Sequence, residues 1–366
     1  MNPPSPERGK MRSIEAARAF AAFAVVLMHA ANLMRVEHFS GHIGMGQVFD
    51  FGYVGVDFFF VLSGFIITYI HYSEIDHFER VPRYLWRRFS RIFPIYWVML
   101  VLSISIVSLG RLATGKGVGF DIGLSDIAGT IFLIIGEGEP KYLGVAWSLQ
   151  YEVVFYLAFC ILMVSARMGT FVFCAWGLFV LARAFGLTSV DLPLNLGNAH
   201  CIQFLCGVGV GLGTRRHRLI VSRNTLVAVL LLFAATVGLE VYGPFGRHSP
   251  EGRIALGLAS SAVLATLVFL ENAHAIRTPK WLARMGSVSY SIYLGHITFI
   301  GLTYAILLKL GAYHSLPEGV VYATAIGVAI SMTFTIGIFV ELPLVSLLKD
   351  RFSSKFEAVR IAVANR

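Results

Sequence analysis

The sequence predicts an all-α, polytopic membrane protein with about ten transmembrane helices and both termini in the cytoplasm. Of the 366 residues, 56% are hydrophobic and only 14% are charged, and the mean hydropathy is +0.71. A soluble domain of ordinary composition carries about 25% charged residues. A water-soluble fold cannot cover this much apolar surface, whereas a bilayer can accommodate it.

Ten apolar runs are long enough to cross a bilayer as helices, which takes about 20 residues. A shorter run at 126–136 cannot cross and is predicted to be a half-helix or a re-entrant segment packed against protein. The runs divide the chain into a cytoplasmic tail at 1–13, one transmembrane domain at 14–347 and a cytoplasmic tail at 348–366. The ten predicted spans are 14–34, 51–71, 91–110, 147–166, 170–187, 197–214, 224–242, 254–271, 288–310 and 319–347.

The basic residues test the number of spans. If the N-terminus is cytoplasmic, the inner segments hold 21 of the 30 Lys and Arg residues. This asymmetry follows the positive-inside rule and supports an even number of helices with both ends in the cytoplasm. The formal charge of +9 then follows from topology, so nucleic acid is not expected as a partner. The four cysteines all fall in predicted spans and form no CxxC pair, so no metal site is expected.

Arg18 and His29 are predicted to share one face of the first helix. They are eleven residues apart, and eleven steps of about 100° return to within about 20° of the starting direction. The same steps separate them by about 16 Å along the helix axis. A charged side chain in hydrocarbon costs about 2.5–3.5 kcal/mol on insertion scales, so both are functional candidates. The competing interpretation is a snorkelling arginine and a histidine satisfied in the core.

Two acidic residues are predicted at the depth of His29. Asp57 lies in "GVDFFFVLSGF" and Glu152 in "AWSLQYEVVFY", each about five or six residues from the outer end of its helix. Either carboxylate is a candidate to orient the imidazole, and the residues do not decide between them. Asp57 is also explained as an acid near a helix N-terminus, where the helix dipole favours it.

Arg88 and Arg91 are predicted at the cytoplasmic start of the third span. They are i, i+3 neighbours in "YLWRRFSRIFPIYW", and guanidinium groups at a helix N-terminus suit phosphate. The alternative is a positive-inside anchor within an aromatic belt. Glycines at alternate positions in "CGVGVGLG" are predicted to allow close helix packing rather than to form a phosphate loop.

Polar and aromatic residues of the fourth and ninth spans are candidates for binding the acceptor. Trp147 and Ser148 are placed to stack on a sugar or to donate to an oxyanion, while His296 is equally explained as a satisfied core histidine. The predicted acceptor-binding residues are Trp147, Ser148, Tyr151, Tyr293 and His296.

These elements together resemble the acyltransferase-3 family, especially its exopolysaccharide and lipopolysaccharide O-acetyltransferases. The matching elements are Arg18-x10-His29, "GVDFFFVLSGF", Arg88-x-x-Arg91, "AWSLQYEVVFY", "YSIYLGH" and a late "ELP", in the family's order over nearly the whole chain. Many members have "GLRG" where this chain has "EAARAF", a departure that resembles the exopolysaccharide branch.

The resemblance implies a multi-pass protein of the bacterial inner membrane that uses acetyl-CoA or another acyl-CoA as donor. It implies a saccharide hydroxyl as acceptor, an essential His29 acting as base or acyl carrier, and arginines that bind phosphate; polysaccharide-biosynthesis machinery is a further candidate partner. Buried charges also mark transport pathways, so a transporter of lipid-linked saccharides is the alternative. Paired inverted repeats with broken helices would favour a transporter, and the sequence shows none.

Overall fold

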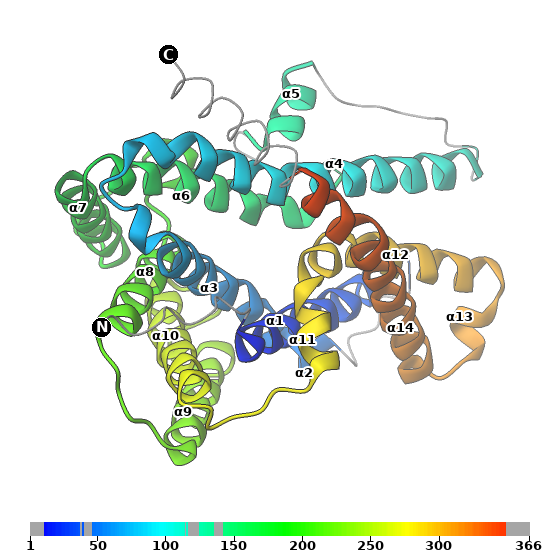
Figure 1. Ribbon diagram of the computed structural model, residues 1–366. Coiled ribbons are helices and arrows are strands. Elements are labelled where there is room, and N and C mark those ends of the chain that lie inside the picture. The colour runs from blue at the N-terminus through cyan, green and yellow to red at the C-terminus, as the bar shows by residue number, and fades with distance from the viewer. Residues whose placement is uncertain are drawn as a thin grey trace.

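The computed structural model describes residues 11–36, 39, 46–113, 115, 124–134 and 142–348. In these ranges the regular structure is helical, and ten helices are long and apolar enough to cross a membrane (Figure 1). The predicted all-α, polytopic fold with ten spans is therefore confirmed. Most of the two predicted tails lies outside the described residues.

The spanning helices are α1 (Arg12–Met34), α3 (Val54–His71), α4 (Val81–Ala113), α6 (Trp147–Val164), α7 (Ala166–Ala184), α8 (His200–Arg216), α9 (Arg223–Val241), α10 (Pro250–Asn272), α12 (Ser289–Lys309) and α14 (Glu318–Ile336), which continues through a π-helical turn (Gly337–Glu341). The short helices are α2 (Gly46–Phe49), α5 (Leu124–Phe132), α11 (Lys280–Ser287) and α13 (Ala312–Ser315), and single 3₁₀ turns cover Asp50–Tyr53, Tyr72–Glu74, Phe78–Arg80, Gly144–Ala146 and Pro193–Asn195.

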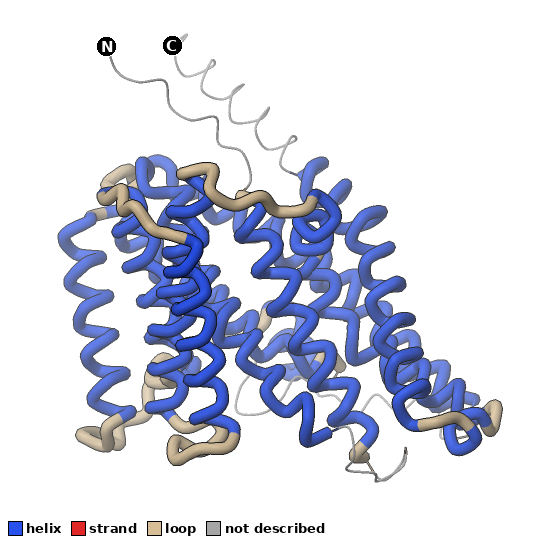
Figure 2. Tube along the Cα trace, turned by 90° about the horizontal axis from the view of Figure 1, so that it is seen from below, coloured by secondary structure: helices blue, strands red, loops and turns tan. Residues whose placement is uncertain are grey.

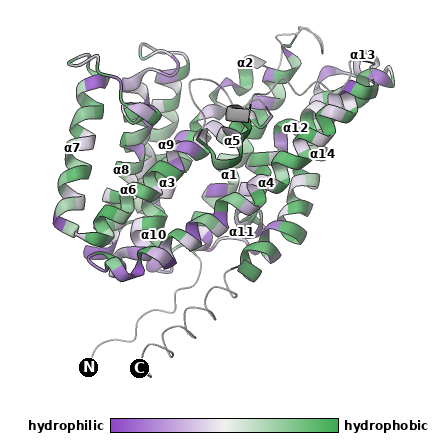
Figure 3. Ribbon diagram, turned by 90° about the horizontal axis from the view of Figure 1, so that it is seen from above, coloured by the Kyte–Doolittle hydropathy of each residue, from purple (hydrophilic) through white to green (hydrophobic). Residues whose placement is uncertain are grey.

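The spanning helices run side by side, and their connections lie at the two edges of the bundle (Figure 2). Glu271 at the end of α10 accepts the backbone N–H groups of Arg12 and Ser13, at 2.6 and 3.0 Å, so α1 begins on the side where α10 ends. We call this the inner side and the opposite one the outer side. Hydrophobic residues dominate along the helices, and hydrophilic ones gather at the connections (Figure 3).

Two elements differ in extent from the predicted spans. The run at 126–136 forms the short helix α5, whose carbonyls of Thr130 and Ile131 accept from Tyr96 and Trp97 of α4. Helix α4 begins at Val81, ten residues before the predicted span at 91–110. The sequence predicts a loop for the basic segment before the apolar run, whereas this segment forms the first turns of α4.

Close contact between α3 and α8 holds the centre of the bundle. A Cβ on Gly207 would overlap the carbonyl oxygen of Val61, and one on Gly64 would overlap that of Phe204. A Cβ on Gly211 would lie 2.8 Å from Cβ of Thr68. Small residues let the two backbones approach within a membrane, where apolar transfer gives no drive for helix association.

The largest core cluster joins α3, α4, α6, α8 and α12. Its fully buried aromatic side chains include Tyr84, Tyr96, Phe155, Phe159 and Phe204. A second cluster joins α1 to α12 and α14. Helix α12 therefore contributes to both clusters and packs between the two parts of the bundle that carry the candidate site.

The α3–α8 contact predicts unequal effects of alanine at neighbouring glycines. Gly207→Ala should destabilise the protein by about 1–3 kcal/mol, because the new methyl overlaps a backbone that cannot yield. Gly209 has no atom within 4 Å of its Cβ position, so Gly209→Ala should be neutral or stabilise by up to about 1 kcal/mol. Thermal unfolding of the detergent-purified variants tests this; equal melting temperatures would contradict it.

Candidate active site

Two histidines face each other between α1 and α12, His296 fully buried and His29 partly buried. Nδ1 of His29 lies 3.0 Å from the carbonyl oxygen of Val25 and 3.1 Å from Nε2 of His296. The ring centroids are 5.0 Å apart and tilted. Nδ1 of His296 lies 3.1 Å from the carbonyl oxygen of Ile292. Among the described residues, the side chain that contacts the His29 ring nitrogen from another helix is therefore a second imidazole, that of His296.

Tyr293 and Ser148 extend this group towards α6. The hydroxyls of Ser148 and Tyr293 are 2.8 Å apart, and Tyr293 donates to the carbonyl oxygen of Val145 at 3.2 Å. The rings of Tyr293 and His296 have centroids 6.1 Å apart. Three of the predicted acceptor-binding residues therefore lie in one connected group with His29.

A second group gathers charges near the inner ends of α1, α4 and α14. Arg18 lies 3.5 Å from Glu15 and within electrostatic range of Arg91, Glu341 and Glu152. One oxygen of Glu341 accepts from the backbone N–H and the hydroxyl of Ser291 on α12, at 3.1 and 2.7 Å. Its other oxygen is buried and has no hydrogen-bond partner among the described residues.

His29 contacts α12 directly, whereas Arg18 is linked to that helix only through its electrostatic interaction with Glu341. Arg18 is near Glu341, which is bound to the start of α12, and His29 contacts His296 further along the same helix. The shared face of α1 stays a prediction, because the close partner of Arg18 is Glu15 of the same helix.

The prediction that Arg88 and Arg91 stand at a helix N-terminus is wrong, because α4 begins at Val81. Arg88 donates to Nε2 of His71 at 2.6 Å, and Nδ1 of His71 lies 2.6 Å from Glu74. The Arg88 guanidinium also lies over the rings of two tyrosines, 5.6 and 5.5 Å from their centroids. Arg88 thus joins the inner ends of α3 and α4, whereas Arg91 belongs to the group around Arg18.

In the part of the chain that the structure describes, neither predicted carboxylate is a hydrogen-bond partner of His29. Glu152 accepts from Ser63 at 3.2 Å and from the hydroxyl of Tyr156. It lies within electrostatic range of Arg18 and Arg91. Glu152 lies five residues from the outer end of α6, yet its carboxylate interacts electrostatically with the arginines of the inner charge group.

Asp57 belongs to a third group, at the outer ends of α3, α8 and α10. Its Oδ1 accepts from Arg253 at 2.8 Å and from Gln203 at 2.6 Å, and its side chain is fully buried. Gln203 also donates to the carbonyl oxygen of Arg253 at 3.0 Å, and its Oε1 lies 3.2 Å from Nδ1 of His200. The negative charge of the buried Asp57 is thereby balanced by the guanidinium of Arg253 on another helix.

Trp147 and Tyr151 pack against this outer group. Their rings have centroids 5.3 and 5.6 Å from that of His200. Arg253 reaches further, donating to Nδ1 of His248 in the loop before α10 at 2.8 Å. Burial and the nearby guanidinium lower the pKa of His248, which keeps that ring neutral and able to accept. The predicted acceptor-binding residues are thus divided between two groups.

Comparison with known proteins now adds the family. A family model described as an acyltransferase domain of the acyltransferase-3 type matches residues 11–340. This chain belongs to the acyltransferase-3 family. It is therefore a multi-pass membrane acyltransferase, as the sequence predicted.

Three relatives carry names that refer to exopolysaccharide production, to acyl transfer or to peptidoglycan O-acetylation. The exopolysaccharide production protein ExoZ of Rhizobium meliloti (strain 1021) is 26% identical over 299 residues, 78% of this chain and 89% of ExoZ. Acyltransferase MdmB of Streptomyces mycarofaciens is 26% identical over 323 residues, 80% of this chain and 79% of MdmB. Peptidoglycan O-acetyltransferase OatA of Listeria monocytogenes serovar 1/2a is 24% identical over 338 residues, 81% of this chain and 50% of OatA. No solved structure gives a significant match.

Sequence reasoning missed the partners of Asp57. His200 and Gln203 are polar residues inside an apolar run, a signal that applies to any bilayer-spanning helix. Arg253 precedes the predicted span at 254–271 by one residue and was counted with the outer connections, but it lies inside α10. A search for cations opposite each buried acid would have selected Arg253.

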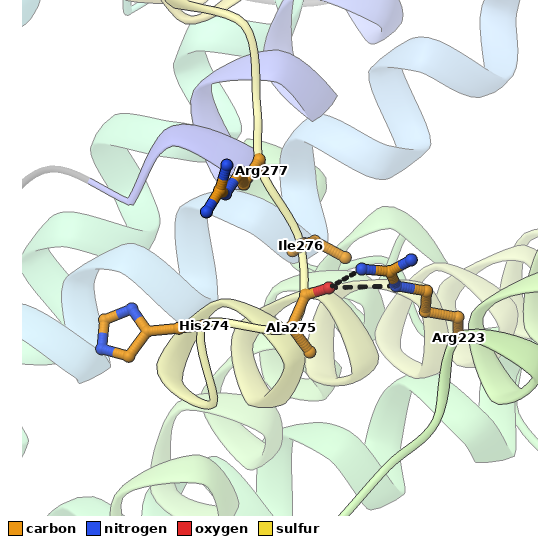
Figure 4. Close-up of a pocket in the computed structure, with 5 residues that line it drawn as sticks. All are labelled: Arg223, His274, Ala275, Ile276 and Arg277. Atoms are coloured by element: carbon orange, nitrogen blue, oxygen red, sulfur yellow. Dashed lines mark hydrogen bonds between the residues drawn. The ribbon is translucent and has the colours of Figure 1, made fainter.

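A pocket on the inner side lies away from these groups (Figure 4). It is formed by Arg223 at the start of α9 and by residues 274–277, which follow α10. The Arg223 guanidinium donates twice to the carbonyl oxygen of Ala275, at 3.1 and 2.9 Å, and so fastens this connection to α9. The pocket is open to the surface, and its lining includes none of the predicted site residues.

The Asp57–Arg253 ion pair predicts that substitutions of its two residues have non-additive effects on the free energy of unfolding. Arg253→Met should destabilise the fold by about 3–5 kcal/mol, because it leaves a buried carboxylate without its cation. Asp57→Asn combined with Arg253→Met should recover most of that loss. Arg183→Met, which breaks an exposed pair with Asp191, should cost no more than about 1 kcal/mol. Thermal unfolding measures all of these variants; additive losses in the double variant would contradict the pairing.

Proposed function

We propose that this acyltransferase moves an acyl group, most readily acetyl, from acyl-CoA to a hydroxyl of a cell-surface or lipid-linked saccharide at the bacterial inner membrane. The observation that carries the proposal is the pairing of His29 on α1 with His296 on α12, with Arg18 about 16 Å from His29 along the axis of α1 and among the charges of the inner side. The printed names of ExoZ and OatA, which refer to exopolysaccharide and to peptidoglycan O-acetylation, support a saccharide acceptor.

The donor would bind from the inner side. Arg18, Arg88 and Arg91 are the groups proposed to hold the phosphates of CoA, because a guanidinium can engage phosphate through two parallel hydrogen bonds. Arg91 is the most available of the three, since no described residue forms a hydrogen bond or close ion pair with it. The extended pantetheine arm of CoA would then carry the thioester along the α1–α12 face to His29.

The acceptor would approach from the outer half of the bundle. Ser148 and Tyr293 place two hydroxyls beside the histidine pair, where they can hydrogen-bond a sugar or the oxyanion of the reaction. Trp147 and Tyr151 offer aromatic faces at the outer end of α6, and aromatic rings stack well on the apolar faces of sugar rings.

In the proposed reaction, a neutral His29 lies between the donor, which binds from the inner side, and the acceptor, which binds from the outer half. His29 takes the proton of the acceptor hydroxyl as its oxygen attacks the thioester carbonyl carbon. The carbon–sulfur bond then breaks, and the CoA thiolate takes the proton from His29. General-base assistance of this kind is worth about 10²–10⁴-fold in rate. If His29 instead attacks the thioester, an acyl-imidazole would carry the acyl group before the acceptor arrives.

Replacing His29 tests the proposal directly. His29→Ala should lower acyl-CoA-dependent thiol release and acetylation of the saccharide by at least about 100-fold, because the base is removed. His77→Ala, which removes an exposed histidine before α4, is the matched control and should keep full activity. Both variants should elute as folded protein in size-exclusion chromatography. Near-normal turnover in folded His29→Ala would refute the mechanism, and a protein that never releases thiol from acyl-CoA would favour the transporter alternative.

The donor site predicts a change in acyl-CoA binding. Arg91→Ala should raise the KM for acyl-CoA by about 10-fold or more, as expected for the loss of charge-assisted hydrogen bonds, and should alter the KM for the acceptor much less. Arg83→Ala removes an exposed arginine of the same helix and is the control. A rise confined to the acceptor KM would reassign the arginines to the diphosphate of a lipid-linked acceptor.

A further inference from the structure

Only one arrangement of protons on neutral His29 and His296 avoids placing a nitrogen lone pair against another lone pair. Nδ1 of His296 lies 3.1 Å from the carbonyl oxygen of Ile292, so this nitrogen must carry a proton to donate. A neutral His296 then presents a lone pair at Nε2. The opposite tautomer would place a lone pair of His296 against the carbonyl oxygen and is disfavoured.

The same reasoning fixes the proton of His29. Its Nδ1 lies near two acceptors, the carbonyl oxygen of Val25 at 3.0 Å and Nε2 of His296 at 3.1 Å. This nitrogen therefore carries the proton and shares it between them. The other ring nitrogen of His29, Nε2, is left as the lone pair that can accept a proton.

We propose that His296 is a positioning residue for the base, an inference that rests on the proposed function. As a neutral acceptor, it holds His29 in the tautomer whose Nε2 is basic and keeps the ring plane directed towards the acceptor. When His29 takes the hydroxyl proton, the hydrogen bond from its Nδ1 to His296 becomes charge-assisted and stabilises the imidazolium.

The surroundings hold the two rings in register. Tyr304 of α12 donates to the carbonyl oxygen of Ala30 at 3.1 Å, and Tyr322 of α14 donates to that of Leu27 at 2.8 Å. The backbone of α1 is thereby fastened on both sides of His29. Gly295, next to His296, lets α12 approach α14, because a Cβ there would lie 2.8 Å from a methyl carbon of Thr333.

An imidazole suits this position better than a carboxylate. A buried carboxylate beside His29 would favour the protonated ring in the resting enzyme, and a protonated ring cannot act as a base. It would also carry a desolvation cost that the neutral ring avoids. His296 therefore orients the ring while leaving it neutral until the reaction supplies a proton.

Two substitutions of His296 separate positioning from packing. His296→Leu keeps a buried side chain but has no acceptor, so kcat should fall about 10- to 100-fold with little change in the KM of either substrate. His296→Gln retains an oxygen able to reach the position of Nε2, and kcat should stay within a few-fold of the parent. Equal losses in the two variants, or activity unchanged in His296→Leu, would overturn the inference.

A spectroscopic readout tests the protonation of His29 in the parent protein, without any change at His296. In parent protein labelled with ¹⁵N-histidine, the His29 signal, identified by its loss in His29→Gln, should report a neutral ring protonated at Nδ1. A ring protonated at Nε2 would overturn the inference. Failure of the proposed function would appear separately, as thiol release that persists in His29→Ala, whatever the His296 variants do.

Discussion

The bilayer leaves no water to solvate polar groups, so each charge inside the bundle must be paired or hydrogen-bonded within the protein. Asp57 shows the consequence most clearly, because its carboxylate is fully buried and is held by Arg253 and Gln203 from two other helices. The same constraint shapes the inner side, where Arg18 lies among carboxylates from three different segments. Such contacts fix helix against helix, and the positions of the candidate catalytic groups follow from them.

Helix α12 connects the parts of the candidate site. It presents Ser291 to the carboxylate of Glu341, Tyr293 to Ser148 and His296 to His29, in that order from its inner end. The π-helical turn ends at Glu341, and π-helical turns are frequent at functional sites. Because one helix contacts both the inner charge group and the histidine pair, displacement of α12 would alter both together.

The sequence predicted the number of spans and the short helix near residue 130, because these depend only on hydropathy and helical periodicity. It did not predict the partner of His29. Equal distance from a helix end gives similar depth, but it leaves the direction of a side chain around the helix undetermined, so Asp57 and Glu152 seemed equally placed. The partners of Asp57 are 146 and 196 residues away in sequence, and only the packing of α3 against α8 and α10 brings Gln203 and Arg253 to it.

The balance of charge at the inner side bears on how a phosphate-bearing donor would be held. Arg18 and Arg91 lie among the carboxylates of Glu15, Glu341 and Glu152, so this group carries no excess of positive charge. Long-range attraction would therefore contribute little, and affinity would have to come from directed hydrogen bonds formed at contact. The carboxylates have a clear role when no donor is bound, because the two partly buried guanidiniums of Arg18 and Arg91 would otherwise repel each other. For a phosphate to bind, it must replace a carboxylate as the partner of a guanidinium, and Glu15, 3.5 Å from Arg18 and near the inner end of α1, is the carboxylate best placed to give way.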